Sequence, residues 1–170
     1  MKKALLVIDL QNDYLWEYRK VKFAYDTEKI ISTVNNFIRQ YQNEGHDIIY
    51  IKHIIQNNPI NRKLFGFSIQ GTEGAELYGG LDVVSSYCFE KLLPDAFSSK
   101  KLKDFMKERQ YDAVSICGVD EGGCVSATAR GAVRNGLFVE MLTEGIATYF
   151  PDAKTRKLRN GLEARGVKYV

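Results

Sequence analysis

The stretch Ala4-Leu5-Leu6-Val7-Ile8-Asp9 decides the fold class of this chain. A run of apolar residues that ends at a carboxylate is typical of a parallel strand buried on both faces. A helix with one apolar face is predicted next, from the N-cap candidate Asp26 to Gly45, followed by a second apolar strand over residues 47–53. A strand, a helix and a strand in this order form a right-handed parallel crossover. The sequence therefore predicts an α/β protein.

The remainder of the chain continues this alternation. Apolar and β-branched runs predict extended segments at 81–84, 87–91, 113–117, 137–142 and 167–170. Cap residues and helical spacing predict helices that follow Ser98 or Ser99, span 125–135 and begin at Pro151. Residues 54–80 contain Asn57-Asn58-Pro59 and several glycines, which predict turns and a long irregular segment. Segments of that kind are more often functional than idle, so we expect this one to cover a site.

Composition bounds the class of protein. The 170 residues suit a single domain over 1–170, and 45% apolar with 26% charged residues is ordinary for a globular fold. The 24 basic residues are scattered among 21 acidic ones, which predicts no nucleic-acid partner. No apolar run approaches the ~20 residues of a membrane span, and the amino-terminal run is too short for a signal-peptide core. We therefore expect a cytoplasmic protein with no membrane partner.

The three cysteines, Cys88, Cys117 and Cys124, are odd in number and lie in apolar or glycine-rich surroundings. That pattern favours a reduced intracellular protein over a disulfide scaffold. Cys124 stands where a strand turns into a helix, and the positive end of a helix favours the thiolate. Cys88 and Cys117 are expected to pack as small hydrophobic side chains.

Three polar side chains follow predicted strands. Because ligands of an open parallel sheet bind outside the carboxyl ends of its strands, Asp9, Lys91 and Cys124 are expected to face one crevice. They would supply a base, a cation and a nucleophile, and the glycines at 122 and 123 would let backbone N–H groups approach a substrate. This set suits acyl transfer through a thioester. Taken singly, Asp9 could cap a loop, Lys91 could be a solvated lysine and Cys124 a small buried side chain.

Three motifs in order resemble one family. Residues 4–14 are similar to an opening strand with a D-x-Q-x-D-[FY] signature, residues 91–97 to a K-x(4)-A-F segment, and residues 118–125 to a G-[VI]-x(4)-C-V turn. The chain thus resembles the isochorismatase-like cysteine hydrolases, which include nicotinamidases, N-carbamoylsarcosine amidase and ureidoacrylate amidohydrolases. The resemblance spans nearly the whole chain.

The resemblance implies a three-layer α/β/α sandwich with a mainly parallel central sheet. It implies that Asp9, Lys91 and Cys124 form the catalytic triad, and that a cis peptide at Val119-Asp120 aims the Asp120 and Cys124 N–H groups at the oxyanion. The implied reaction is hydrolysis of a small-molecule amide substrate, since the relatives that cleave a vinyl ether lack the cysteine. A homo-oligomer, a dimer or a tetramer, is implied as well.

The metal pattern of nicotinamidases is incomplete here. Those relatives carry Asp-x-His just after the second strand, as part of a set of one Asp and two His, whereas this chain has Ile51-Lys52-His53. We therefore expect no metal and no cofactor, with a nicotinamidase that has an atypical metal site as an alternative. His53 is expected to pack or hydrogen-bond at the strand end, or else to contact substrate, and His46 to lie in a solvent-facing turn.

Four further residues are assigned to substrate binding: Gln11, Tyr14, Phe65 and Glu121. Tyr14 and Phe65 would form aromatic walls for a small planar group, although Phe65 suits a core or interface role equally well. Glu121 would favour a cationic or amine-bearing substrate, or would be a solvated carboxylate at a helix start. Trp16 suits either an aromatic wall of the site or a core or interface position.

Two other functions compete with the hydrolase. One is a non-catalytic small-molecule-binding member of the same fold, which separation of Asp9, Lys91 and Cys124 beyond hydrogen-bond distance would favour. The other is a redox protein that uses Cys117 and Cys124, although their spacing is not a C-x-x-C motif.

Overall fold

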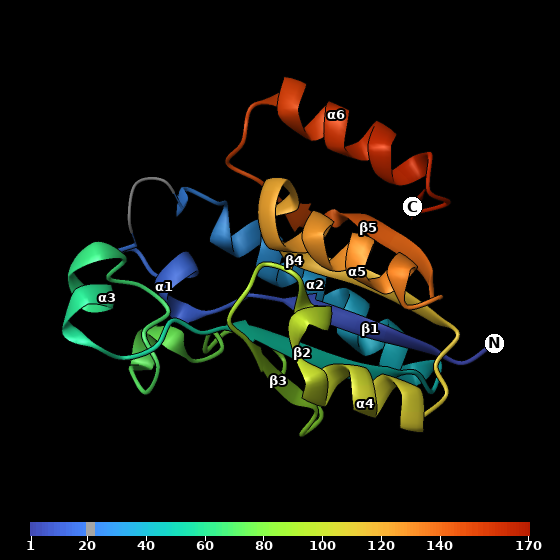
Figure 1. Cartoon of the computed structure of the whole chain (residues 1–170), viewed down its shortest axis with the longest axis horizontal. Coiled ribbons are helices and arrows are strands. Elements are labelled where there is room, and N and C mark those ends of the chain that lie inside the picture. The colour runs from blue at the N-terminus through green and yellow to red at the C-terminus, as the bar shows by residue number, and fades with distance from the viewer. Residues whose placement is uncertain (20–22) are drawn as a thin grey trace.

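A computed structural model describes residues 1–19 and 23–170 of the chain. In this part of the chain six strands form one sheet in the order β3-β2-β1-β4-β5-β6 (Figure 1). Each neighbouring pair is parallel. The strands are β1 (Lys3–Ile8), β2 (Asp47–His53), β3 (Cys88–Lys91), β4 (Ala113–Val119), β5 (Phe138–Ala147) and β6 (Lys168–Tyr169).

Helices cover both faces of the sheet (Figure 1). They are α1 (Asn12–Leu15), α2 (Thr27–Asn43), α3 (Pro59–Leu64), α4 (Lys100–Glu108), α5 (Ser126–Arg134) and α6 (Asp152–Glu163). Successive side chains of β1 point to opposite faces of the sheet, so the strand contributes to two cores. Leu6 and Ile8 belong to the core shared with α4 and α5, and Leu5 and Val7 belong to the core shared with α2. The predicted three-layer α/β/α sandwich is confirmed.

Helix α2 forms as its sequence predicts. The Asp26 side chain accepts a hydrogen bond from the Lys29 N–H at 3.0 Å, which caps the first turn. Val34 and Ile38 on its apolar face are completely buried against the sheet. Gly45 follows the helix with a φ of +77°, a conformation that glycine adopts without strain.

The order of the strands in the sheet indicates where a ligand-binding crevice lies. The chain continues outward from β1 on one side and from β4 on the other, so the carboxyl ends of these adjacent strands form the switch point where open α/β sheets bind ligands. Gly118 makes the close approach possible, because a Cβ at this position would lie 2.1 Å from the backbone oxygen of Ile8. Its φ of +116° also excludes ordinary side chains. The segments after β1 and β4 are thereby brought together.

Two sequence-based expectations differ from the structure. Residues 81–84 form no strand, because the Tyr50 hydroxyl donates to the Asp82 carbonyl at 2.7 Å and accepts from the Val84 N–H at 3.1 Å, which takes this segment out of the ladder. The segment 54–80 is not wholly irregular, since it contains α3 and two isolated bridges, Gln11 to Leu77 and Ile55 to Ile69. None of the described helices is both long and apolar enough to cross a membrane.

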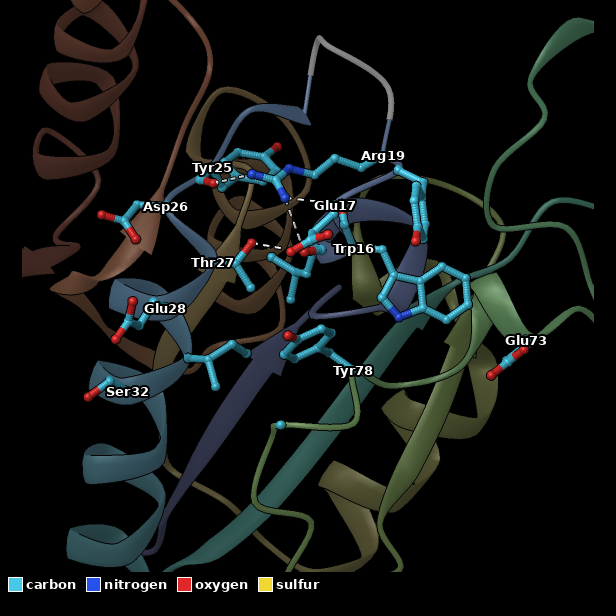
Figure 2. Close-up of a pocket in the computed structure, with 14 residues that line it drawn as sticks. Trp16, Glu17, Arg19, Tyr25, Asp26, Thr27, Glu28, Ser32, Glu73 and Tyr78 are labelled. Carbon is cyan, nitrogen blue, oxygen red and sulfur yellow. Dashed lines mark hydrogen bonds between the residues drawn. The ribbon is translucent and has the colours of Figure 1, made fainter.

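A hollow of about 980 Å³ lies between α1, the start of α2 and residues 73–80 (Figure 2). Trp16 and Tyr78 line it, which places Trp16 at the surface of this hollow. Arg19 donates to the carbonyl oxygens of Leu15 and Tyr25 and so connects the end of α1 to the residue before the Asp26 cap of α2. None of the three side chains proposed for chemistry lines this hollow, so its size does not make it the reaction site.

Candidate active site

Lys91 joins the other two residues of the predicted triad. Its ammonium nitrogen lies 2.9 Å from Asp9 Oδ2 and 3.1 Å from Cys124 Sγ. Each side chain leaves the carboxyl end of a different strand, β3, β1 and β4 respectively. Burial lowers the pKa of Lys91, but Asp9 and Cys124 raise it by more, so the pKa lies above its ordinary value. The lysine is therefore a buried cation at neutral pH.

Asp9 occupies a turn that directs its carboxylate into the site. Its φ of +53° is in the left-handed region, which Asp populates more readily than most residues. The backbone N–H donates to the Ile51 carbonyl at 2.9 Å, so the turn stays joined to β2. The residue is only 2% exposed, and its Oδ1 atom has no hydrogen-bond partner among the described atoms.

The turn from β4 into α5 carries Cys124 and is held by the side chain of Asp120. This carboxylate accepts from the Gly122 N–H at 2.6 Å, from the Thr148 hydroxyl at 2.8 Å, from the Tyr149 N–H at 2.8 Å and from the Tyr25 hydroxyl at 3.1 Å. The peptide bond between Val119 and Asp120 is cis. Asp120 thus connects the cysteine turn to the segment after β5.

The two glycines before Cys124 have different surroundings. A Cβ at Gly122 would lie 2.1 Å from the Phe150 ring, so this glycine allows the aromatic ring to pack on the turn. Gly123 lines the cavity in front of the cysteine, where its backbone is open to a ligand. Close approach to a substrate is therefore available at Gly123 and not at Gly122.

Cys124 holds its proton in the resting site. Burial raises the pKa of the thiol to about 12, Asp9 adds to the rise, and Lys91 opposes it. Burial and Asp9 thus oppose the helix end and Lys91, both of which favour the thiolate. Burial is the largest of these effects, because an apolar environment disfavours the charged thiolate. A neutral thiol beside a carboxylate has an acceptor for its proton within the site.

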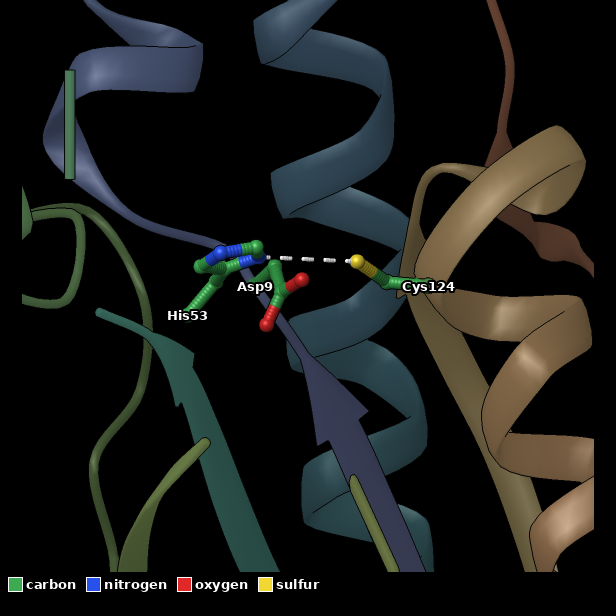
Figure 3. Close-up of side chains that lie close together, drawn as sticks. All are labelled: Asp9, His53 and Cys124. Atoms are coloured by element: carbon green, nitrogen blue, oxygen red, sulfur yellow. Dashed lines mark hydrogen bonds between the residues drawn. The ribbon is translucent and has the colours of Figure 1, made fainter. Parts of the chain in front are cut away.

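His53 stands next to the thiol at the end of β2. Its Nδ1 atom lies 3.8 Å from Cys124 Sγ, as Figure 3 shows together with Asp9. Burial, and then the charge of Lys91, lower the pKa of the imidazole. His53 is therefore neutral near pH 7. His53 both makes a polar contact at the strand end and lines the cavity, so its position is compatible with each of the two roles expected for it.

A cavity of about 170 Å³ opens in front of these residues. Asp9, His53, Gly123 and Cys124 form its polar end. Six aromatic side chains form most of the remainder: Tyr14, Phe23, Tyr25, Phe67, Tyr149 and Phe150. The space suits a small molecule with a planar apolar part, and its reactive carbon would lie at the thiol end.

Sequence reasoning found one of these aromatic walls. Tyr14 lines the cavity as expected, with its hydroxyl 2.7 Å from Ser68 Oγ. Phe65 does not line it; this ring lies 6.3 Å from the Phe67 ring, and Phe67 is the residue at the cavity. Tyr149 and Phe150 follow the carboxyl end of β5, so the strand-end rule that selected Asp9 could also have found them.

Gln11 and Glu121 are corrected as well. Gln11 is completely buried and clamps the backbone of His53: its side-chain nitrogen donates to the His53 carbonyl at 2.9 Å, and its oxygen accepts from the His53 N–H at 2.8 Å. Glu121 is 1% exposed, and Arg159 donates to both of its carboxylate oxygens. Neither residue lines the cavity. Gln11 hydrogen-bonds to the backbone of His53, and Glu121 pairs with Arg159.

The other two cysteines differ from each other. Cys117 is fully buried on β4 and burial raises the pKa of its thiol, which argues against a redox pair with Cys124. Cys88 is exposed, so the expectation that it packs is wrong. It lies on β3, an edge strand with few neighbours to cover it.

The nicotinamidase type of metal site does not fit these residues. The position that would carry the Asp of Asp-x-His is Ile51, which is 1% exposed in the apolar core. Lys52 is 2.8 Å from Glu76 and points away from the site as a paired cation. Only His53 of this motif can donate to a metal.

Comparisons with known proteins agree with this architecture. A family model described as "Isochorismatase domain" matches residues 3–168. An uncharacterized isochorismatase family protein of Bacillus subtilis is 27% identical over 150 residues, which cover 87% of this chain and 79% of that protein. A probable inactive nicotinamidase of Arabidopsis thaliana is 26% identical over 174 residues, which cover 91% and 85%. The crystal structure of a pyrazinamidase of Pyrococcus horikoshii in complex with zinc has a TM-score of 0.84 at 25% identity and covers 100% of this chain and 99% of its own.

Proposed function

Because this chain belongs to the isochorismatase family of hydrolases, we propose that it is a cysteine hydrolase that cleaves the C–N bond of a small amide or carbamoyl compound through a thioester. The observation that carries the proposal is the position of Lys91, whose ammonium contacts both Asp9 Oδ2 and Cys124 Sγ. A base, a cation and a nucleophile within hydrogen-bond distance favour catalysis over passive binding.

The first half of the proposed reaction forms the thioester. Asp9 takes the proton of the neutral Cys124 thiol, and Lys91 stabilises the sulfur as its charge develops. The sulfur attacks the carbonyl carbon, and the oxygen that gains charge is bound by the N–H groups of Asp120 and Cys124. Asp9 then returns its proton to the nitrogen, and ammonia or an amine leaves.

The second half releases the acid. Asp9, again a carboxylate, takes a proton from water while the water oxygen attacks the thioester carbon. The C–S bond breaks and Cys124 recovers the proton as a thiol. No step uses a metal ion, since this chain's own Asp9 activates both nucleophiles.

The aromatic cavity supports an amide with a planar group. Six aromatic side chains surround about 170 Å³, which limits the substrate to a small molecule. One of the similar proteins is named a pyrazinamidase and another a probable inactive nicotinamidase, and both names refer to small aromatic amides. A nicotinamidase with an atypical metal site is the second form of this proposal.

Ammonia release across a panel of small amides and carbamoyl compounds tests the proposal. Wild type and Cys88→Ala are expected to turn over at least one compound, whereas Cys124→Ala is expected to lose at least about 1,000-fold of that rate. Cys88 is the matched control because it is an exposed thiol outside the site. Wild type that never exceeds Cys124→Ala would support the non-catalytic binding function. Nicotinamide turnover that requires added zinc would support the atypical nicotinamidase.

The proposal includes assembly into a cytoplasmic homo-oligomer, a dimer or a tetramer. Support comes from α3, in which no residue is buried although Ile60 is 75% and Leu64 70% exposed. These two side chains lie four positions apart on one helix face, which a second copy could cover. Sedimentation velocity of wild type against Leu64→Glu measures this: the variant is expected to sediment as a smaller species.

A further inference from the structure

Three metal-binding atoms of different kinds meet in the site. A carboxylate oxygen of Asp9, a ring nitrogen of His53 and the sulfur of Cys124 all lie within 4.8 Å of one another. They come from the turn after β1, the end of β2 and the turn after β4, which the parallel sheet brings to one point (Figure 3). The cluster is therefore built by the fold and does not depend on a single loop.

One of these atoms lacks a partner. The Oδ2 atom of Asp9 is paired with Lys91, whereas Oδ1 is buried and accepts no hydrogen bond from the described residues. Figure 3 shows the Asp9 carboxylate in the gap between His53 and Cys124, with one oxygen directed toward the cysteine. A buried acceptor without a donor favours any ligand that can satisfy it.

The donor set fits zinc. Zn²⁺ binds sulfur at about 2.3 Å, nitrogen at about 2.0 Å and carboxylate oxygen at about 2.1 Å in a tetrahedron, which separates sulfur from nitrogen by about 3.5 Å. The observed separation of His53 Nδ1 and Cys124 Sγ is 3.8 Å. The three atoms all lie within 4.8 Å of one another, a limit about 1 Å above the ligand separations of a tetrahedral zinc site. Mg²⁺ and Ca²⁺ prefer sets of oxygen atoms and fit this cluster poorly.

The fourth coordination position is open. Asp9, His53 and Cys124 all line the cavity of about 170 Å³, so a zinc ion on them would face space for a water molecule. Ionised Asp9 and Cys124 supply two negative charges against the charges of zinc and of Lys91.

We infer that Asp9, His53 and Cys124 bind Zn²⁺ and that this zinc blocks the nucleophile. A Zn–S bond forms as the S–H bond of Cys124 breaks; the proton leaves to solvent, and nothing is oxidised or reduced. Bound zinc would inhibit the enzyme instead of assisting it, because it would bind both the proposed base, Asp9, and the proposed nucleophile, Cys124. The binding follows from the cluster alone, whereas the block rests on the proposed function.

Calorimetric titration of the full chain with Zn²⁺ at neutral pH tests the binding. Wild type is expected to bind one equivalent, and Cys124→Ser, His53→Ala and the similarly sized His53→Gln are each expected to bind at least 10-fold more weakly. Cys88→Ser and His46→Ala are the matched controls, an exposed thiol and the second histidine, and are expected to match wild type. Mg²⁺ is expected to produce no heat of binding. Equal affinity in the Cys124 and His53 variants, or weakened binding in the controls, overturns the site.

Alkylation of Cys124 by iodoacetamide, followed by peptide mass spectrometry, gives a readout without substrate. Zinc is expected to slow this alkylation at least 10-fold in wild type and by less than 2-fold in His53→Gln, with EDTA restoring the wild-type rate. Zinc that accelerates amide turnover would overturn the block. If zinc binds and protects Cys124 while no amide is cleaved, the proposed function fails and the zinc site stands.

Discussion

Arg159 on α6 donates two hydrogen bonds to the carboxylate of Glu121, 2.6 Å to Oε1 and 2.8 Å to Oε2. Glu121 lies three residues before Cys124, in the turn Glu121–Val125, whose backbone is not helical at Gly123. A paired, planar contact of this kind fixes orientation as well as distance. The last helix of the chain therefore holds the turn that carries the thiol.

Removal of this contact is expected to destabilise the protein. Arg159→Ala leaves the Glu121 carboxylate buried without its partner, and a loss of about 2 kcal/mol is expected, less than for a fully buried pair because Arg159 is 41% exposed. Urea unfolding measures the change. Arg156→Ala, an exposed arginine on the same helix, serves as the control and is expected to stay within about 0.5 kcal/mol of wild type. Equal losses in both variants would contradict the role of the Glu121 contact.

Asp9→Asn is expected to separate thiol ionisation from catalysis. Because the Asp9 charge raises the pKa of Cys124 from its ordinary value, the neutral Asn lowers that pKa and increases alkylation of Cys124 near pH 8. Amide turnover is expected to fall at least about 100-fold, since the base and proton donor are gone. Alkylation rates followed by mass spectrometry in a Cys88→Ser background measure the first effect. A slower alkylation in Asp9→Asn would refute this electrostatic account.

Lys91→Met is expected to act on the thiol in the opposite direction. Lys91 lowers the pKa of Cys124, so its removal moves that pKa further above about 12 and slows alkylation at every pH below it. The same pH series measures the shift. Lys101→Met, an exposed lysine at the start of α4, is the matched control. Alkylation of Lys91→Met at the wild-type rate would show that this ammonium does not act on the sulfur.

His53 makes stability depend on pH. Burial lowers its pKa in the folded protein below the ordinary value of 6.5, so the unfolded chain binds more protons between the two values. The stability that comes from neutral His53 is therefore full above pH 6.5 and falls as the pH drops below it. Urea unfolding from pH 7.5 to pH 5 is expected to show a shallower fall in His53→Gln than in wild type. His46→Gln should retain the wild-type slope; a fall of equal steepness in the two variants argues against burial of His53 as the cause.

Gly118→Ala tests the close approach of β4 to β1. The new Cβ would meet the Ile8 oxygen at 2.1 Å with a φ of +116°, and a loss of about 3 kcal/mol or more is expected. Gly45→Ala, with a φ of +77° and nothing within 4 Å, isolates the backbone cost and should lose only about 1 kcal/mol. Urea unfolding of both variants measures the difference, and similar losses would mean that the contact with Ile8 relaxes.

Local sequence was enough for the strands and for the residues at their ends. Continuous apolar runs identify β1, β2 and β4 because strands buried on both faces need no alternation, and this pattern is complete within each run. Asp9, Lys91 and Cys124 follow from one rule about strand ends, which requires only that the strands are parallel. The structure brings these three side chains together, and their catalytic roles stay predictions.

The sequence by itself determined the α/β class and the three side chains of the site, because both depend on patterns carried by neighbouring residues. Tertiary structure decided what each remaining side chain contacts. Glu121 was predicted to meet substrate, yet it is bound by Arg159, 38 positions away, and no local pattern specifies such a partner. The raised pKa of Cys124 was decided in the same way, since burial and the charge of Asp9, which is 115 positions away in the sequence, both depend on the fold.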